Sequence, residues 1–480
     1  MASLQSTYRN QGRWKESEEL EVREMETNMR VLGQEHPGTL ISMSSLASTY
    51  SKQGRWKEAE DILVRVIDMR KRVLGQEHPD MLTSMDELAS TYLKQGRWKE
   101  AEELSVRVID MRKRVLGQEH PDLLTSMDNL ALTYLKQGQW MEAEELFVQT
   151  IGTKIRLLGQ EHPDTLTSMD NLASTYLKQG RWKKAEELSV QVTETRKRVL
   201  EQEHQDTLTS MDTLASTYLH QGRWKEAEEL FAQVIWMEKR VLGHEHSTTL
   251  SSMANLASTY LKQGQWKEAE ELFMQVTGVC SRVLGQEHPY TLISMNGLAS
   301  AYLNQGRWKE AEKLFMQVIE TEKRVIGQDH PDLLTSMDNL ASTYLKQGQW
   351  KKAEELFLQV IQTRKRVLGQ EHPETLTSVS NLASIYGRQG RWMEAEKLSV
   401  QAFEASSRVL GQEHPETLTY MNNLALIWKN QHRDAEAVEL LSSCLEISTR
   451  KLGTNHPNTL TCTKTYNTWK AKNQSACEGG

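Results

Sequence analysis

Residues 163–204 read PDTLTSMDNLASTYLKQGRWKKAEELSVQVTETRKRVLEQEH, and near-copies of this stretch lie on both sides of it along the chain. Tryptophan marks the copies at a spacing of 42 residues, at Trp14, Trp56, Trp98, Trp140, Trp182, Trp224, Trp266, Trp308, Trp350 and Trp392. Histidine keeps the same spacing from His36 to His456. A fixed period between about 20 and 50 residues is typical of stacked structural units that share one core. The sequence therefore predicts a tandem array rather than separate globular domains.

Each unit carries the pattern of two helices separated by a short break. Pro163 suits the first position of a helix, because that position needs no backbone N–H donor. Apolar residues recur at steps of three and four from Leu166 to Tyr176, which is typical of one face of an α-helix. Gly180 interrupts this pattern, and a second amphipathic helix begins at Trp182. Neither helix can bury its apolar face within one hairpin, so we expect stacking on neighbouring hairpins to bury it.

The connector that joins successive units contains a glycine, a histidine and a proline in most copies. We expect the glycine, for example Gly159, to end the second helix as a left-handed cap. We interpret the histidines as residues that cap backbone groups, because copies one repeat apart cannot reach a common zinc ion. We interpret the tryptophans as wedges packed between helices in the core.

Two connectors depart from this pattern and predict local weakness. Glu201 replaces the glycine and Gln205 the proline of one connector, and Ser247 replaces the proline of the next. We therefore predict that the array is softest around residues 201–250. Gly152 also stands inside a second helix, where glycine costs about 1 kcal/mol relative to alanine.

The unit resembles the tetratricopeptide repeat. The matching residues are Leu172-Ala173-Ser174-Thr175-Tyr176, Gly180-Arg181-Trp182, Ala185, and the later apolar position held by Phe147, Phe231, Phe273, Phe315 and Phe357 in their repeats. The ordinary repeat has about 34 residues. The form with 42 residues is similar to the kinesin light chain type and to the C-terminal repeat arrays of NACHT and NB-ARC signalling NTPases.

The resemblance implies an all-α fold, a right-handed α-solenoid superhelix of about eleven helical hairpins plus a C-terminal capping helix. We expect residues 1–456 to form the array, with a truncated first repeat, and residues 457–480 to form the capping helix and a disordered tail. Met1 aligns with Met43, inside a first helix, so we expect the N-terminus to be that of a truncated gene model or of a fragment. The heptad coiled coil of kinesin light chains and the phosphate loop of the NTPases do not occur in the sequence.

Composition narrows the function. The net charge is -7, with acidic and basic residues interspersed, which argues against a nucleic-acid surface. The sequence contains neither a long apolar window nor a secretory signal, so we expect no membrane partner and a cytoplasmic protein with reduced cysteines. Cys444 and Cys462 could approach one another in adjacent helices. We find no metal-ligand spacing and no catalytic motif, so we expect neither a cofactor nor an enzyme.

The polar face of the first helix is the candidate binding surface. In the resembled family the first helices line a concave groove, and polar residues on this face contact an extended peptide. Carried across the repeats, the asparagine positions are Asn129, Asn171, Asn255, Asn339, Asn381 and Asn423. The basic positions are Lys94, Lys136, Lys178, Lys262, Lys346 and Arg388. An asparagine amide can both donate to and accept from a peptide backbone.

This face is also compatible with a plain solvated helix surface. Aspartates such as Asp170 stand beside the asparagine position, where we expect them to repel an acidic ligand, and the basic row partly offsets them. The ligand's charge therefore stays open. The function predicted is a protein–protein interaction scaffold or adaptor that holds an extended peptide or helix, kinesin light chain-like. The alternative is the detached ligand-sensing repeat arm of a NACHT or NB-ARC type NTPase, and an enzyme is a remote third possibility.

Overall fold

The computed structural model describes residues 5, 8 and 13–478, and for residues 471–478 it describes the backbone alone. Over these residues the chain is helical and contains no strand. The first helices of successive hairpins are α3 (Pro37–Lys52), α5 (Pro79–Lys94), α7 (Pro121–Lys136), α9 (Pro163–Lys178), α11 (Gln205–His220), α13 (Ser247–Gln263), α15 (Pro289–Asn304), α17 (Pro331–Lys346), α19 (Pro373–Arg388) and α21 (Pro415–Asn430). The second helices are α2 (Trp14–Leu32), α4 (Trp56–Leu74), α6 (Trp98–Leu116), α8 (Trp140–Leu158), α10 (Trp182–Val199), α12 (Trp224–Val241), α14 (Trp266–Val283), α16 (Trp308–Val325), α18 (Trp350–Val367), α20 (Trp392–Val409) and α22 (Asp434–Leu452). The helix α23 (Pro457–Glu478) follows the last hairpin.

The two-helix unit predicted from residues 163–204 is confirmed. α9 begins at Pro163 and α10 at Trp182, and the other hairpins repeat these boundaries. The described residues hold ten complete hairpins, preceded by α2 and followed by α23. The truncated start expected for the first repeat falls within residues 1–12, most of which lie outside the described residues. The capping role of α23 and the disordered tail stay predictions, and residues 479–480 lie outside the described residues.

The connector histidines cap the first helices, as the sequence predicts. Nδ1 of His162 accepts a hydrogen bond from the backbone N–H of Asp164 at 3.2 Å, and the first helices from α3 to α21 all begin with this contact. The connector glycines have positive φ, but those that end α2, α4, α6, α8 and α22 do not form left-handed caps. Gly159 has φ 94° and ψ 162°, an extended form that is nearly exclusive to glycine. Glu201 takes a φ of 75° at the equivalent place, so its backbone is strained.

The apolar core runs continuously from hairpin to hairpin. Phe147 of α8 is fully buried in a cluster that includes residues of α7, α9 and α10. Phe231, Phe315 and Phe357 are fully buried at the same position of their hairpins. The cluster around Phe147 draws on more than one hairpin, and the same holds around Phe357. The structure thus agrees with the expectation that stacking on neighbours buries the apolar faces.

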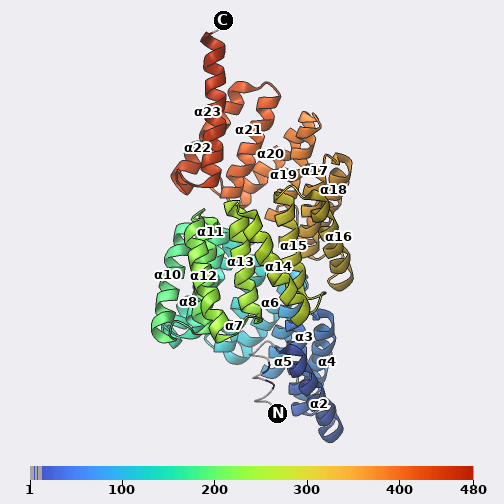
Figure 1. The fold of residues 1–480 in the computed structure, drawn as a ribbon. Helices are drawn as coiled ribbons and strands as arrows, with labels where there is room; N and C mark the ends of the chain where they lie inside the picture. The colour runs from blue at the N-terminus through green and yellow to red at the C-terminus, as the bar shows by residue number, and fades with distance from the viewer. Residues whose placement is uncertain (1–4, 6–7, 9–12, 479–480) are drawn as a thin grey trace.

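The array coils so far that its second half lies above its first half (Figure 1). Nε2 of His330 lies 3.0 Å from the carbonyl oxygen of Lys94, a residue 236 positions earlier. His288, His372 and His414 make the same contact with the carbonyl oxygens of Lys52, Lys136 and Lys178. We call this line of contacts the seam. It joins the turns that follow α3, α5, α7, α9 and α11 to the connectors that precede α15, α17, α19, α21 and α23.

The turns on one side of the seam, which follow α3, α5, α7, α9 and α11, require glycine. A Cβ atom on Gly54 would lie 2.4 Å from Cδ of Pro289, and one on Gly180 would lie 2.6 Å from Cδ of Pro415. Gly54 also has φ 75°, which other residues rarely adopt. Glycine at this turn therefore both reverses the chain and lets the next turn of the superhelix approach.

Four tryptophans of the series lie at the seam and others are exposed, so the interpretation of the series as wedges in the core is wrong. Trp56 stacks on His330 with ring centroids 5.6 Å apart, and Trp98, Trp140 and Trp182 meet His372, His414 and His456 in a similar way. Trp350, at the start of α18, has no such ring contact in the described structure and keeps 43% of its surface exposed. Each tryptophan begins a second helix at the rim of its hairpin, where only the next turn of the superhelix can cover it.

Candidate functional site

The first helices line the concave side of the superhelix. Neighbouring first helices contact one another along the array, for example α9 with α11 and α13 with α15. Neighbouring second helices in the described part of the chain show no comparable contact with one another. The second helices therefore form the outer layer. The side on which the helices approach most closely is the inside of the curve. This agrees with the predicted placement of the candidate binding surface.

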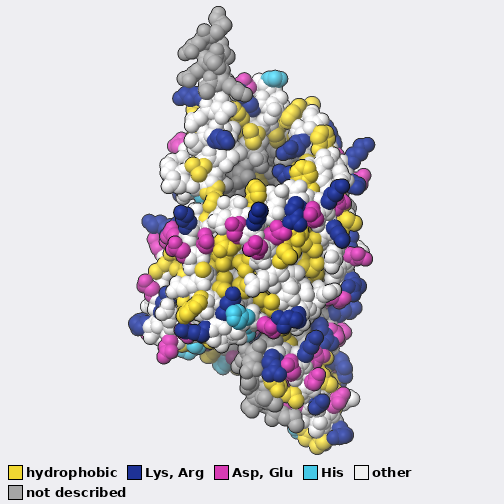
Figure 2. All heavy atoms as spheres, viewed as in Figure 1, with side chains coloured by type: hydrophobic (Ala, Val, Ile, Leu, Met, Phe, Trp, Pro, Cys, Tyr) yellow, Lys and Arg dark blue, Asp and Glu magenta, His cyan; other side chains and the backbone are white. Residues whose placement is uncertain are grey.

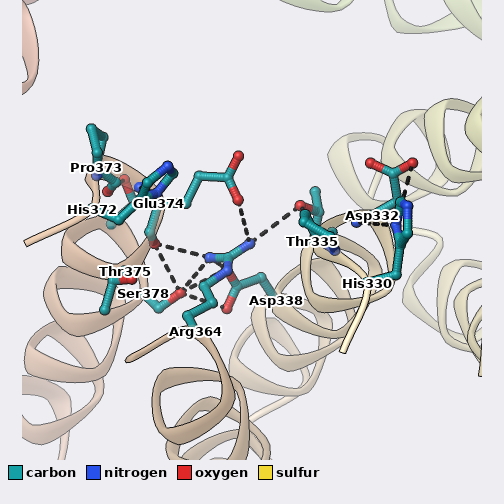
Figure 3. Close-up of polar contacts among 12 residues, drawn as sticks. His330, Asp332, Thr335, Asp338, Arg364, His372, Pro373, Glu374, Thr375 and Ser378 are labelled. Atoms are coloured by element: carbon teal, nitrogen blue, oxygen red, sulfur yellow. Dashed lines mark hydrogen bonds and ion pairs between the residues drawn. The ribbon is translucent and has the colours of Figure 1, made fainter. Parts of the chain in front are cut away.

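A buried ion pair ties each of several hairpins to the next, and Figure 3 shows the one at Arg364. The guanidinium group of Arg364, on α18, donates to the carboxylate of Asp338 on α17 and to Oγ of Ser378 on α19 at 2.5 Å. It also reaches the carbonyl oxygen of Glu374 at 3.0 Å. The side chain of Arg364 is 3% exposed and that of Asp338 is 11% exposed. One cation from a second helix thus fastens two consecutive first helices.

The same arrangement recurs along the array. Arg196 of α10 donates to Asp170 of α9 at 2.6 Å and to Ser210 of α11 at 2.7 Å. The other members are Arg112 with Asp86 and Ser126, and Lys154 with Asp128 and Ser168. We call these sets the junction clusters. Burial raises the pKa of the Asp170 carboxyl to about 6, against the opposing effect of the Arg196 charge.

The junction clusters correct the expectation that the aspartates repel an acidic ligand. Asp86, Asp128, Asp170 and Asp338 are buried rather than presented to the groove. Each is paired with a cation from the following second helix. Their charge is therefore compensated inside the wall of the superhelix, where it has little effect on a ligand.

Two junctions carry an acid in place of the cation, Glu238 of α12 and Glu322 of α16, and only the first has an aspartate, Asp212, at the neighbouring first-helix position. Glu238 of α12 stands where Arg196 stands in the preceding repeat, and it is 3% exposed. Burial raises the pKa of Glu238 to about 7, and the charge of Asp212 adds to this effect. Burial also raises the pKa of Asp212 to about 6. Oδ1 of Asp212 and Oε2 of Glu238 have no hydrogen-bond partner among the described residues.

The predicted asparagines lie in a half-buried row on the first helices. Nδ2 of Asn255 donates to Asp212 at 3.0 Å, Nδ2 of Asn339 donates to Asn296 at 3.0 Å, and Nδ2 of Asn423 donates to Ser380 at 3.3 Å. These three amides thus bridge neighbouring first helices. The side chains of Asn129, Asn171 and Asn381 make no hydrogen bond within the described part of the chain.

The predicted basic residues lie at the end of the first helices, and all six side chains are exposed: Lys94, Lys136, Lys178, Lys262, Lys346 and Arg388. Nζ of Lys94 donates to Oγ of Ser51 at 2.8 Å. The surrounding walls of the superhelix and the charge of Lys52 lower the pKa of Lys94. Across the seam, the charge of Lys178 acts to lower the pKa of Glu416, although burial outweighs it and raises that pKa.

A pocket of about 360 Å³ opens between α3, α5 and α7 on the concave side. It brings together Lys94 and Asn129 from the predicted set with Glu87, which takes the asparagine position on α5. Oε2 of Glu87 is buried and has no hydrogen-bond partner among the described residues. Burial raises the pKa of Glu87, while the charge of Arg70 opposes this. The pocket therefore offers an acceptor, a cation and an amide at neighbouring positions.

The other predicted residues do not converge on one place, since successive repeats carry them around the curve. Sequence reasoning missed Glu87 and Glu416, because both fall outside the asparagine and lysine pattern. It also missed the cation of the junction clusters. A signal for that cation was present: position 112 and its copies at 154, 196 and 364 hold arginine or lysine on the otherwise apolar face of the second helix.

Other candidate chemistry is limited to the cysteines. Sγ of Cys444 lies 3.6 Å from Sγ of Cys462, and both thiols are free and buried, so the predicted approach is confirmed. Burial raises the pKa of Cys280 to about 11, which disfavours the reactive thiolate. The described residues include no group of three side chains placed to hold a metal ion. None of the helices described has the length and apolar character needed to cross a membrane.

The chain belongs to the tetratricopeptide repeat family. One tetratricopeptide repeat model matches eight overlapping segments between residues 80 and 432, and a second matches residues 6–38, 39–80 and 417–458. Together the matches cover nearly all of the array. They confirm the predicted family and the all-α repeat solenoid.

Solved structures similar to the chain include two forms of a putative kinesin light chain from Podosopora anserina with nearly identical TPR-like repeats. They share 37% and 36% identity with the chain, cover 43% of it and 98% and 97% of their own length, and have TM-scores of 0.37 and 0.36. BtubC (BKLC) from P. vanneervenii shares 18% identity over 51% of this chain and 92% of its own, with a TM-score of 0.37. A search of curated proteins gave no significant match.

Proposed function

We propose that the protein is a cytoplasmic interaction scaffold that holds an extended peptide along its concave face, in the manner of a kinesin light chain-like adaptor. In this repeat array neighbouring hairpins share one continuous core. Such an array offers a long continuous surface, which suits extended ligands. The free thiols of Cys280, Cys444 and Cys462 are compatible with a reducing compartment.

The observation that carries the proposal is the set of unused polar atoms at the pocket between α3, α5 and α7. Among the residues that the structure describes, the amide of Asn129 makes no hydrogen bond, and the buried Oε2 of Glu87 has no partner. A buried acceptor without a partner costs about 1–3 kcal/mol. A peptide N–H or a lysine of the ligand that donates to Glu87 removes this cost, while Asn129 bonds the adjacent peptide group.

The neighbouring asparagine extends the site along the array. Asn171 stands one repeat further on α9 and also makes no internal side-chain hydrogen bond among the described residues. By contrast, Asn255 and Asn339 already use their N–H groups to bridge first helices. We therefore place the principal contacts of the peptide on α5, α7 and α9, in the first half of the array.

The test is selection of peptides from a random display library on the whole chain, followed by titration of the selected peptides. We expect Asn129→Ala and Asn171→Ala each to weaken binding about fivefold, since one net hydrogen bond is worth roughly 1 kcal/mol. Gln191→Ala is the matched control, because Gln191 is an exposed amide on the outer helix α10. Peptides that bind both asparagine variants and the control with unchanged affinity would contradict the proposal, as would a selection that yields no binder.

A further inference from the structure

The seam joins two different kinds of segment, the turns within hairpins and the connectors between hairpins. Further turns in the second half of the array and further connectors in the first half have no partner of this kind in the described structure. The upper edge consists of the turns that follow α13, α15, α17 and α19, each with a glycine and the next tryptophan. The lower edge consists of the connectors that precede α3, α5, α7, α9 and α11, each with a capping histidine. The seam within the chain is formed by the same two kinds of segment. Turns with a glycine in the first half of the array meet connectors with a histidine in the second half.

On the free edges, the residue positions that are covered within the seam are exposed. A Cβ on Gly306, Gly348 or Gly390 would meet no atom within 4 Å, whereas a Cβ on Gly96 in the seam would meet Pro331 at 2.5 Å. Trp266, Trp308 and Trp350 are 42%, 39% and 43% exposed. The side chain of His120 on the lower edge is 39% exposed, while that of His330 in the seam is 6% exposed.

We propose that the upper edge of one molecule binds the lower edge of a second copy of this chain, head to tail. The second copy repeats the contacts that already join the two turns within one molecule. Prolines enter the open space over the turn glycines, tryptophans stack on histidines, and histidine Nε2 atoms meet helix-end carbonyl oxygens. The complementarity is shown by the molecule itself, because four of its own carbonyl oxygens accept this contact from His288, His330, His372 and His414.

The helix α23 sets where the second copy begins. It starts at Pro457 on the seam, as the first helix of a further hairpin would, so that position is already taken. The position taken by α23 lies over Gly222, and a second copy displaced by two repeats from it places Pro37 over Gly306, Pro79 over Gly348 and Pro121 over Gly390. In this register Trp308 meets His78 and Trp350 meets His120, and α2 of the second copy lies beyond α23.

The interface is small and its two faces differ, which determines how the protein associates. An interface between unlike faces that does not close on itself produces a linear stack instead of a closed dimer. Within one chain the seam is helped by the covalent connection, which a second molecule lacks. We therefore expect weak association, with a dissociation constant on the order of 0.1 mM.

The experiment is sedimentation velocity with small-angle X-ray scattering on the full chain over a range of concentrations. We expect the mass to rise with concentration and the particle to lengthen at constant cross-section. Trp350→Glu should abolish growth from the upper edge, and His120→Asp, which can still cap α7, should abolish growth from the lower edge. A mixture of the two variants should form dimers only, because each retains one intact edge.

Met274→Glu is the control, since Met274 is 53% exposed on the outer helix α14 and lies on neither edge. Its association should equal that of the unchanged chain. A chain that stays monomeric up to about ten times the expected dissociation constant would overturn the proposal. So would association that survives both edge substitutions, growth of the cross-section instead of the length, or higher oligomers in the mixture.

Discussion

Two consecutive junctions of the array differ in the sign of the charge at one position, and the difference shows what the buried cation contributes. At the first, Arg196 joins Asp170 on α9 to Ser210 on α11. At the second, Glu238 takes the place of the arginine, between Asp212 on α11 and Ser252 on α13. Both positions are buried, so the first junction holds a compensated ion pair and the second holds two carboxyl groups that share one site.

The comparison teaches that equal repeats are not equally stable. The two hairpins have the same boundaries, although Ser189 and Thr193 of α10 stand where α12 has Phe231 and Ile235. A buried carboxyl pair must bind a proton or carry two charges at close range, and either state costs free energy that the ion pair avoids. The junction at Glu238 lies within residues 201–250, which the connectors already predict to be soft.

The largest effect is expected from converting the first junction into the second. Arg196→Glu leaves Asp170 buried beside another carboxyl group, and loss of one partner of a buried pair typically costs about 3–5 kcal/mol. The opening free energy of α9 to α11 in hydrogen exchange measures this loss. Arg198→Glu is the control, because the Arg198 and Glu161 side chains of its ion pair are more than half exposed and such pairs contribute little. Equal losses for the two variants would show that the buried cation has no special role.

The converse substitution should strengthen the second junction. Glu238→Arg brings a guanidinium group to Asp212, to Ser252 and to the carbonyl oxygen of Thr248, the counterparts of the groups that Arg196 contacts. We expect α11 to α13 to gain about 2–3 kcal/mol of opening free energy at pH 8. Glu229→Arg, an exposed change on the same helix, should have little effect. A destabilised Glu238→Arg chain would contradict the comparison.

The second junction should also depend on pH. The pKa is raised in the folded state, to about 7 for Glu238 and about 6 for Asp212, so the folded chain retains protons that the unfolded chain releases. The stability from this pair is therefore complete below about pH 4, the ordinary carboxyl range, and is lost as pH rises through 6 and 7.

We expect the exchange rate of α11 to α13 to increase from pH 5 to pH 8 after correction for intrinsic exchange. Glu238→Gln should reduce this dependence to the part that Asp212 contributes, because a neutral amide of the same shape cannot titrate. The junction at Lys154 serves as an internal reference for changes that do not involve the carboxyl pair. A dependence on pH that is equally steep in Glu238→Gln would exclude Glu238 as its origin.

The smallest effect concerns the connectors that precede the two junctions. Gly159 adopts φ 94° without strain, whereas Glu201 adopts φ 75° at the equivalent place. Glu201→Gly should stabilise the chain by about 1 kcal/mol, and Gly159→Glu should destabilise it by at least as much. Thermal unfolding of the two variants beside the parent chain tests this, and effects of the same sign in both would contradict it.

The sequence predicts most of the fold because each repeat unit contains the residues that determine its own helices, caps and core. Pro163, His162 and Phe147 show where a helix begins, how it is capped and what fills the core, and the period repeats these rules along the chain. The seam could not be predicted, since the number of hairpins in one turn depends on a small rotation per repeat that no single motif encodes. Trp56 and Trp308 stand in the same stretch, QGRWKEAE, yet only the coiling of the array decides which one is covered.

The candidate site was predicted in part. The helix face is the expected one, and Lys94 and Asn129 share a pocket. The prediction that the aspartates face the ligand was wrong. Helical spacing predicts the direction of the Asp170 side chain, but it does not reveal that Arg196 of the next helix pairs with it. Pairing across helices depends on residues 26 positions apart, which a pattern within one helix does not reveal.

The central claim is that the array closes on itself along the seam, and a distance measurement tests it most directly. Lys57 and Gln286 line one cavity from opposite sides of the seam, although about half of the chain lies between them in sequence. Spin labels at Lys57→Cys and Gln286→Cys, in a chain whose native cysteines are replaced by alanine, report their separation by double electron–electron resonance. We predict one narrow distribution shorter than a hairpin, which is about 25 Å long. A broad distribution centred well beyond that length would show an open coil and would contradict the account.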